Sequence, residues 1–245
     1  MAETLFGGLA WSPDSKRIAF QGKYGSTLPV REAIYVVDSD GRNLRRLSLG
    51  SDDAHLESPR WSPDGARIAF LRRDLGAGQQ IVTMNPDGSD QRVVFSAYDL
   101  GPFQWSPNGL EIAFSAARTN HFPQYDIYVM NPRGARLRNL TGTPRSDESW
   151  PRWSPNGQMI AFERYVGHKG HVHRMTRDGK NDLVLDLPKT NGEEPAWSPD
   201  GRSVVFVSRR DGNRDIYVVT ATGRDQANIT NSRIPTQDYA PAWVP

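Results

Sequence analysis

The chain has 245 residues, of which 37% are hydrophobic and 24% are charged, a composition that supports a folded core and opposes disorder. Its 30 basic and 28 acidic side chains are interspersed, whereas a nucleic-acid-binding protein concentrates lysine and arginine on one face, so no nucleic acid is expected as a partner. The absence of cysteine excludes disulfides, thiol catalysis and thiolate metal sites. No apolar run approaches the roughly 18 residues of a membrane-spanning helix, so no membrane insertion is expected.

One phrase, Trp-Ser-Pro-Asp-Gly, recurs along the whole sequence with small changes. Its tryptophans lie roughly 45 residues apart, which is within the length of one β-propeller blade. The proline and glycine of each copy, together with alternating β-branched residues, oppose helical repeats of similar length. The tryptophans are Trp11, Trp61, Trp105, Trp153 and Trp197, and a shortened copy contains Trp243.

Each repeat is predicted to contain four strands. The first strand ends at the tryptophan, and Ser-Pro-Asp-Gly then forms a type I turn, because proline presets φ at the second position and glycine accepts the fourth. The second strand has two large apolar residues on one face and a small residue between them. These second strands are expected at 18–20, 68–70, 112–114, 160–162 and 204–206.

The third strands are expected at 34–37, 81–84, 127–130, 172–175 and 216–219, each followed by a glycine-containing hairpin and a fourth strand. Four antiparallel strands per repeat, arranged radially, predict an all-β fold, a single β-propeller domain over residues 1–245. The repeat units are about 5–50, 51–98, 99–144, 145–188 and 189–234, with 235–245 as a closing strand. Five blades are favoured, and the extra copy of the first strand leaves six as the alternative.

The repeated turn, the Ile-Ala-Phe strand, the strand from Asp126 to Asn131 and the Leu140-Thr141 ending together resemble the TolB-type propeller repeat of bacteria. The resemblance implies a WD-repeat-like scaffold that binds a protein or peptide and is not an enzyme. It also implies a periplasmic or extracellular location. Residues 1–6 lack the basic and apolar regions of a secretion signal, so a cytoplasmic location is the alternative. We expect a monomer without a cofactor. TolB itself resembles a six-bladed propeller preceded by a small α/β domain, which has no counterpart in this sequence.

Acidic residues gather just before the first strand of several repeats. If those strands line the central tunnel, the acids form a ring at one mouth, with arginines just inside it. Such a ring would bind an amino group, basic side chains or a cation. The alternative is that these acids are solvated or pair with nearby arginines. The predicted partner-binding residues are Glu57, Arg60, Glu148, Arg152, Glu194 and Asp238.

The fourth repeat has two histidines, His171 and His173, in its third strand where other repeats have aspartate and tyrosine. Two apart on a strand, they point to the same face, and His168 could complete a metal-binding triad. Propellers of pectin-degrading lyases resemble this arrangement, so a metal-dependent polysaccharide lyase or hydrolase is the alternative function. We favour His173 as a packing residue that replaces tyrosine, and predict no metal. Propellers of prolyl-oligopeptidase-like hydrolases also resemble these repeats, but the sequence contains no Gly-x-Ser-x-Gly nucleophile motif.

Overall fold

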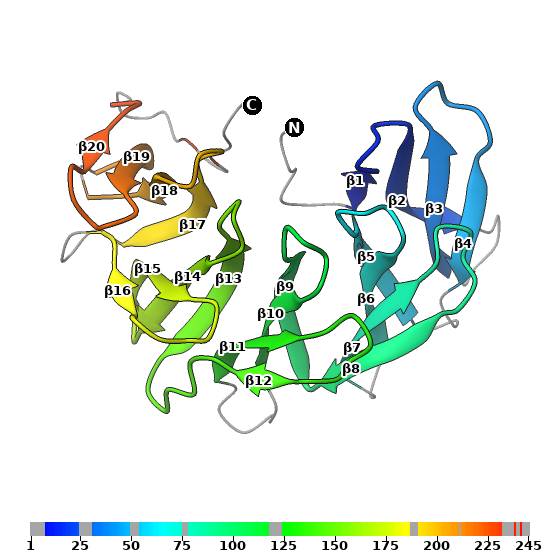
Figure 1. Cartoon of the computed structure of the whole chain (residues 1–245), viewed down its shortest axis with the longest axis horizontal. Helices are drawn as coiled ribbons and strands as arrows, with labels where there is room; N and C mark the ends of the chain where they lie inside the picture. The colour runs from blue at the N-terminus through cyan, green and yellow to red at the C-terminus, as the bar shows by residue number, and fades with distance from the viewer. Residues whose placement is uncertain are drawn as a thin grey trace.

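The computed structural model describes residues 8–24, 31–49, 54–74, 78–117, 124–186, 191–210, 212–231, 238 and 241. The regular elements within these ranges are all β-strands, which form five four-stranded antiparallel sheets. Figure 1 shows the sheets arranged around a common centre as the blades of a propeller. The predicted all-β propeller fold is confirmed. None of the described segments forms a helix with the length and apolarity needed to cross a membrane.

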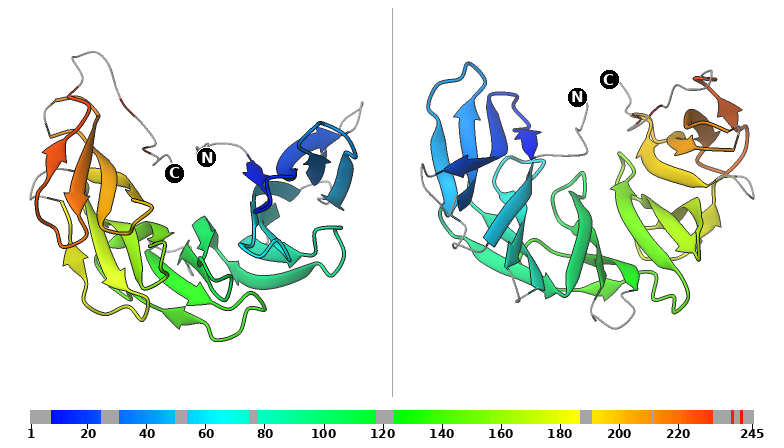
Figure 2. Two further views of the ribbon diagram at one scale, coloured as in Figure 1. Left: turned by 45° about the horizontal axis from the view of Figure 1, so that its top comes forward. Right: turned by 180° about the vertical axis from the view of Figure 1, so that it is seen from behind.

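The strands follow one another from the centre of the molecule to its outside in every blade (Figures 1 and 2). Blade 1 contains β1 (Leu9–Trp11), β2 (Arg17–Tyr24), β3 (Arg31–Asp38) and β4 (Arg45–Leu49). Blade 2 contains β5 (Ala54–Trp61), β6 (Ile68–Asp74), β7 (Gly78–Met84) and β8 (Arg92–Ala97). Blade 3 contains β9 (Asp99–Trp105), β10 (Ile112–Ala117), β11 (Tyr125–Met130) and β12 (Arg138–Asn139).

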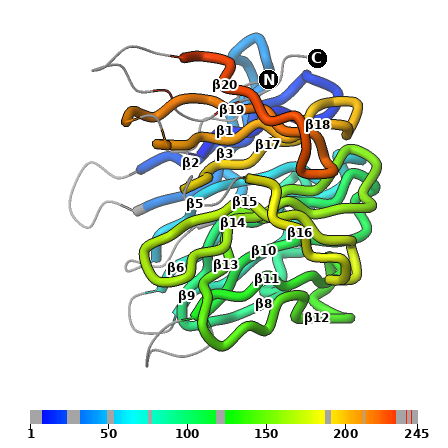
Figure 3. The backbone as a smooth tube through the Cα atoms, turned by 90° about the vertical axis from the view of Figure 1, so that its left-hand side faces the viewer, coloured from blue at the N-terminus to red at the C-terminus, as the bar shows by residue number. Residues whose placement is uncertain are grey.

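Blade 4 contains β13 (Asp147–Trp153), β14 (Met159–Val166), β15 (Lys169–Thr176) and β16 (Leu183–Val184). Blade 5 contains β17 (Gly192–Trp197), β18 (Ser203–Ser208), β19 (Asp215–Thr220) and β20 (Ala227–Asn228). In the side view of Figure 3 the strands run across the molecule, along the direction in which Figure 1 is viewed. Each blade therefore presents the edge of its first strand to the centre. The closing strand predicted at 235–245 lies outside the described residues apart from Asp238 and Pro241.

The turn after each inner strand is stabilised by its own side chains. In blade 2 the Gly65 N–H donates to the carbonyl of Ser62 at 2.9 Å, and the Ser62 hydroxyl donates to Asp64 at 2.5 Å. The Arg67 N–H donates to the same hydroxyl at 2.9 Å and so begins the second strand. Gly65 has a φ of +69°, which glycine adopts without a Cβ penalty. Blade 1 has Ser15 at this position, with a φ of +57°.

In blades 2 to 5 the tryptophan that ends the inner strand joins its blade to the preceding one. In three blades the indole N–H donates to the backbone carbonyl of the residue that directly precedes the tryptophan of the blade before. The pairs are Trp61 with Ala10 (3.2 Å), Trp105 with Arg60 (3.2 Å) and Trp197 with Arg152 (2.9 Å). Blade 4 differs, because the backbone N–H of Trp153 instead donates to the Gln104 side chain at 2.7 Å. The repeated phrase therefore creates contacts between blades as well as turns.

Apolar side chains fill the space between successive blades. The second strand of each later blade buries its large residues against the preceding blade, and the phenylalanine of this strand is almost fully buried in blades 2 to 5. Further out, the hairpin glycines allow close approach between blades. A Cβ on Gly88 would lie 2.6 Å from the Leu47 carbonyl oxygen, and one on Gly134 would lie 2.3 Å from that of Val94. Contacts of this kind, repeated from blade to blade, build the arc.

One face of blade 1 has no such neighbour among the described residues. Figures 1 and 2 show the five blades as an open arc with blades 1 and 5 at its ends. Trp11 is 36% exposed, whereas the tryptophans of the other four repeats are at most 8% exposed. Nothing lies within 4 Å of a Cβ built on Gly41, the hairpin glycine of blade 1. The contacts that bury a tryptophan therefore depend on the blade that precedes it.

We predict that tryptophans of the same motif differ in their contribution to stability. Trp105→Ala should lower the free energy of unfolding by about 3–5 kcal/mol, because it leaves a cavity and removes a bond between blades. Trp11→Ala should cost roughly 1 kcal/mol, because this ring is partly exposed. Denaturant unfolding followed by circular dichroism measures both. Equal losses would contradict the role given to the preceding blade.

We also predict that Ser15→Gly raises the stability of the first turn. A residue with a Cβ in the left-handed region costs roughly 1 kcal/mol relative to glycine, so the variant should gain up to about that amount. The matched control is Gly65→Ser, which introduces the same strain in blade 2 and should lose stability. Thermal melting of both variants provides the test, and a lower melting temperature for Ser15→Gly would refute the explanation.

Candidate functional site

The inner strands of blades 2, 3 and 4 surround a pocket of about 230 Å³. Its apolar lining includes the buried side chains of Leu71, Leu100 and Phe103. Its polar and aromatic lining comes from β5, β6 and β13. These residues are Glu57, Ser58, Arg60, Arg73, Trp150 and Arg152. A concave apolar site with a few converging polar groups is the usual form of a binding pocket in a protein.

All three inner strands that line this pocket have a β-bulge beside it, and β17 of blade 5 has a bulge as well. The register of β5 against β6 shifts between Glu57 and Arg60, and Ser58 inside the bulge has a φ of +55°. The register of β13 against β14 shifts in the same way, and Trp150 has a φ of +53°. A left-handed backbone costs a residue with a side chain roughly 1–2 kcal/mol and is enriched at functional sites, where bulges redirect side chains. The bulges direct Ser58 and Trp150 to the pocket.

Three of the six predicted binding residues meet in this pocket: Glu57, Arg60 and Arg152. Glu57 forms an ion pair with Arg73, at 2.5 Å between Oε1 and Nε. The guanidinium of Arg152 lies 5.5 Å from the ring centre of Trp150, in a cation–π contact. The two arginines come from equivalent positions of blades 2 and 4. Sequence reasoning did not select Trp150, although no other repeat has an aromatic residue three positions before its tryptophan.

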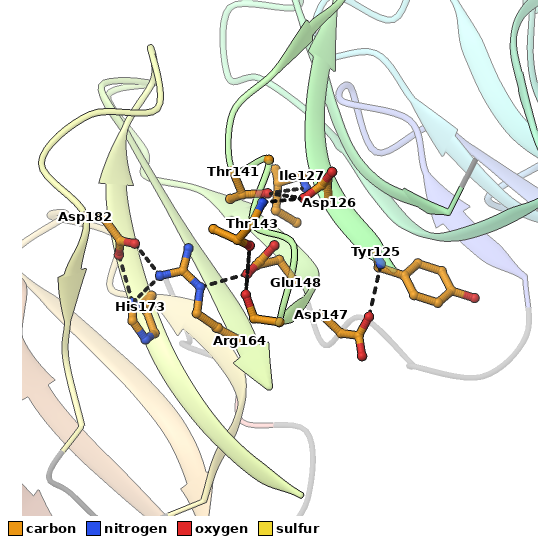
Figure 4. Close-up of polar contacts among 12 residues, drawn as sticks. Tyr125, Asp126, Ile127, Thr141, Thr143, Asp147, Glu148, Arg164, His173 and Asp182 are labelled. Carbon is orange, nitrogen blue, oxygen red and sulfur yellow. Dashed lines mark hydrogen bonds and ion pairs between the residues drawn. The ribbon is translucent and has the colours of Figure 1, made fainter. Parts of the chain in front are cut away.

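Glu148 differs from its predicted role as an exposed carboxylate at the mouth of the tunnel. It is fully buried and lies on β13, directly opposite Arg164 of β14. Arg164 Nε donates to Glu148 at 2.8 Å, and the hydroxyls of Ser146 and Thr143 donate at 2.6 and 2.7 Å (Figure 4). The prediction of exposure is wrong because the strand begins before Glu148 and its pairing turns the side chain into the blade. This carboxylate stabilises blade 4.

The last two predicted residues lie by blade 5 and are not in the lining of the pocket. Glu194 forms an ion pair with Arg214 at 2.9 Å, and the neighbouring Glu193 pairs with the same arginine at 2.9 Å. The backbone N–H of Asp238 donates to the Arg214 carbonyl at 2.9 Å. The three glutamates of the predicted ring are each matched by an arginine, as in the alternative interpretation of these acids. These three described carboxylates are therefore not uncompensated charges at the mouth.

The blade 4 histidines have partners within their own blade. His173 Nδ1 lies 2.8 Å from Asp182, which also accepts a hydrogen bond from Arg164 (Figure 4). Its ring packs on Phe162 at 5.5 Å, much as Tyr128 packs on Phe114 at 5.7 Å. His173 therefore occupies the place that tyrosine has in blade 3. Burial by itself would raise the pKa of Asp182, but the hydrogen bonds from His173 and Arg164 outweigh it and lower that pKa.

His171 forms a separate pair, with its Nδ1 3.2 Å from the buried Asp186. Asp186 also accepts the backbone N–H of Val172 at 3.2 Å. His168 is exposed and lies in the turn between β14 and β15. Among the residues that the structure describes, no group of three or more histidine, cysteine, aspartate or glutamate side chains is placed to hold a metal ion. The two strand histidines are accounted for by their carboxylate partners.

A buried carboxyl group, Glu163, connects blades 4 and 5. It accepts the backbone N–H of Glu194 at 2.6 Å and the hydroxyl of Ser149 at 3.2 Å. Burial raises the pKa of Glu163 to about 7, although these hydrogen bonds act to lower it. Sequence reasoning did not select Glu163. The sequence does mark it as unusual, because Glu163 is charged and directly follows the phenylalanine of the second strand. The residues at this position in blades 2, 3 and 5 are uncharged: Leu71, Ser115 and Val207.

The sequence matches the family model described as the TolB beta propeller domain over residues 3–198. The chain belongs to the TolB β-propeller family. The predicted family resemblance is thereby confirmed. TolB from Acinetobacter baumannii has the same fold, with a TM-score of 0.64 at 23% identity over 83% of this chain and 50% of that one.

Peptidases are also among the proteins that this TolB-family chain resembles. It is 29% identical over 157 residues to dipeptidyl-peptidase 5 of Porphyromonas endodontalis, a match that covers 60% of this chain and 20% of that protein. A puromycin hydrolase structure superposes with a TM-score of 0.76 at 17% identity, over 93% of this chain and 38% of that one. The chain spans between 20% and 53% of the length of the curated relatives it matches.

These matches contradict the prediction that the chain is not an enzyme. That prediction relied on the TolB-type repeat and on the missing nucleophile motif. The repeat specifies the propeller and not the reaction in which a propeller takes part, because function depends on sites added to a fold. The similarity to named peptidases and hydrolases therefore removes the basis for assigning a purely non-enzymatic role.

Glu163 predicts a specific pH dependence of stability. Its pKa is about 7 in the folded protein and near the ordinary value of 4.5 in the unfolded chain. Between these values the folded state keeps a proton that the unfolded state has lost, so the free energy of unfolding falls as pH rises from about 4.5 to about 7. At about 1.4 kcal/mol per pKa unit, this fall is at most roughly 3 kcal/mol.

Glu163→Gln should remove this component, because glutamine accepts the same backbone hydrogen bond and does not titrate. Denaturant unfolding of wild type and variant at several pH values measures the difference. Glu111→Gln is the control and should leave the Glu163 component in place. A stability difference between wild type and Glu163→Gln that is independent of pH would show that Glu163 does not titrate in this range.

Proposed function

We propose that this chain is a peptide-binding propeller domain of a protein that processes or captures peptides. The peptide would bind as an extended segment in the pocket between the inner strands of blades 2, 3 and 4. The observation that carries the proposal is that Arg60, Trp150 and Arg152 line one pocket together with buried apolar side chains. Guanidinium groups can hydrogen bond to peptide carbonyls, while the apolar lining and the indole ring accept an apolar side chain.

The position of the pocket also supports peptide binding. Three inner strands border it, and each presents a strand edge to the centre of the molecule (Figure 1). An exposed strand edge offers main-chain donors and acceptors to an extended segment, a common mode of peptide recognition. The bulges of β5 and β13 interrupt the regular pairing and place side chains beside these edges. Main-chain and side-chain recognition can therefore act together.

The relatives favour a role in peptide processing within this proposal. Dipeptidyl-peptidase 5 bears the name of an enzyme that acts on peptides, and the chain matches a fifth of its length. A propeller of this type would hold or select the peptide on which such a protein acts. We keep a periplasmic or extracellular location as part of the proposal, on the basis of the TolB-type repeat. Protein partners that present an extended segment would use the same pocket.

The proposal predicts that peptides bind and that Trp150 is required. A fluorescein-labelled pool of random hexapeptides should raise its anisotropy on titration with the chain. Trp150→Ala should weaken this binding by about tenfold or more, which corresponds to about 1.4 kcal/mol. The matched control is Trp11→Ala, which removes a partly exposed tryptophan that is not in the lining of the pocket and should leave binding unchanged. Absence of any anisotropy change, or equal binding by Trp150→Ala, would refute the proposal.

A further inference from the structure

A second pocket of about 440 Å³ lies between blades 3 and 4. Gly101 belongs to the lining of both pockets, so the two are adjacent and one extended peptide can occupy both. The second pocket differs in character, because its described lining contains one carboxylate and no lysine, arginine or histidine. These lining residues are Gly101, Ser115, Tyr125, Asp147, Ser149, Tyr165 and Gly167.

Two small residues of blade 3 create space in this second pocket. Gly101 occupies the inner-strand position at which blades 2 and 5 have glutamate, and Ser115 occupies the second-strand position at which they have leucine and valine. A Cβ on Gly101 would lie 2.2 Å from the Ser115 hydroxyl oxygen. That hydroxyl is fully buried and has no hydrogen-bond partner among the residues that the structure describes. Because buried polar groups normally have a partner, this hydroxyl indicates a ligand in the pocket.

The other hydroxyl protons of the second pocket are already in use. The Tyr125 hydroxyl donates to Asp99. The hydroxyls of Ser149 and Tyr165 donate to Glu163. Burial and, secondly, the neighbouring carboxylates raise the pKa of both tyrosines above the ordinary value, so both phenols keep their protons. These three hydroxyl groups therefore offer a ligand only the lone pairs of their oxygens.

Asp147 adds a negative charge to these acceptors. It lies opposite Tyr165 in the pairing of β13 with β14, and it accepts the backbone N–H of Tyr125 from blade 3 at 3.1 Å (Figure 4). The residue is exposed, and it forms no ion pair with any side chain in the described part of the chain. A carboxylate beside two tyrosine rings attracts a ligand that is positively charged and donates hydrogen bonds.

We infer that the second pocket binds a primary ammonium group of the peptide. An ammonium group donates three hydrogen bonds and accepts none, which matches a carboxylate and the lone pairs of hydroxyl groups. A neutral sugar would also need donors, and among the described lining hydroxyls only that of Ser115 has a proton not in use. The ammonium belongs either to the amino terminus of the peptide or to a lysine side chain. This inference rests on the proposed peptide-binding function and gives it a ligand class.

The test compares the binding of four hexapeptides, each with fluorescein on a carboxy-terminal cysteine, to the full chain. The reference peptide is acetylated and has norleucine at a central position. The other three have a free amino terminus, lysine in place of norleucine, or glutamate in place of norleucine. At least one ammonium-bearing peptide should bind about tenfold more tightly than the reference, and the glutamate peptide should bind least. The preference should shrink as salt is raised. The free-amino and lysine peptides distinguish the two sources of the ammonium group.

Asp147→Asn should abolish the preference while the reference peptide still binds, because asparagine keeps the acceptor for the Tyr125 N–H and loses the charge. Ser115→Ala should reduce the preference by removing one acceptor. Asp40→Asn is the matched control, because Asp40 is an exposed carboxylate that accepts a backbone N–H at 2.9 Å in the hairpin of blade 1. Equal binding of all four peptides, or a preference that persists in Asp147→Asn, overturns the ammonium inference alone. Absence of binding by every peptide overturns the proposed function as well.

Discussion

The contact between the tryptophan of one blade and the inner strand of the preceding blade underlies the whole structure. The indole ring is buried only where a preceding blade covers it, and in blades 2, 3 and 5 its N–H reaches the backbone next to the preceding tryptophan. The contact links strands that are about one repeat apart in sequence. It thereby sets the positions of the inner strands relative to one another, and the pocket between blades 2, 3 and 4 exists because these strands are held side by side.

A contact made through the backbone does not constrain the identity of the side chain at the accepting position. Alanine serves in blade 1 and arginine serves in blades 2 and 4, with the same carbonyl accepting the same donor. The repeat can therefore carry different chemistry at each inner strand without loss of packing. The residue three positions before the tryptophan also varies between blades. Where its φ is positive, any residue other than glycine is strained. The inner strands thus provide both the backbone contacts that recur between blades and the side chains that differ from blade to blade.

Blade 4 illustrates how a departure from the repeat is compensated within a blade. The histidines of β15 take positions held by aspartate and tyrosine in blade 3, and Asp186 and Asp182 supply the matching partners. In blade 3 the equivalent Asp126 accepts a hydrogen bond from the Asn139 side chain and one from the backbone N–H of Thr143, the second of which is drawn in Figure 4. In blade 3 the carboxylate is on the third strand, whereas in blade 4 the histidines are on the third strand and the carboxylates follow it in the chain. The polar contact with the region of the fourth strand remains in both blades. Buried polar groups need a partner, so such exchanges occur in pairs.

The sequence by itself determined the blades, their order and the TolB family. Those features depend on local patterns, such as the turn that begins at Ser62 and the alternation in Ile68 to Phe70, which recur and so reinforce one another. Only the tertiary structure decided which charges face the pocket. Glu148 is buried against Arg164 and Glu57 is paired with Arg73, because strand register brings together residues about 15 positions apart. The pocket and the place of Trp150 in it likewise required three blades in contact, since the lining residues come from blades 2, 3 and 4.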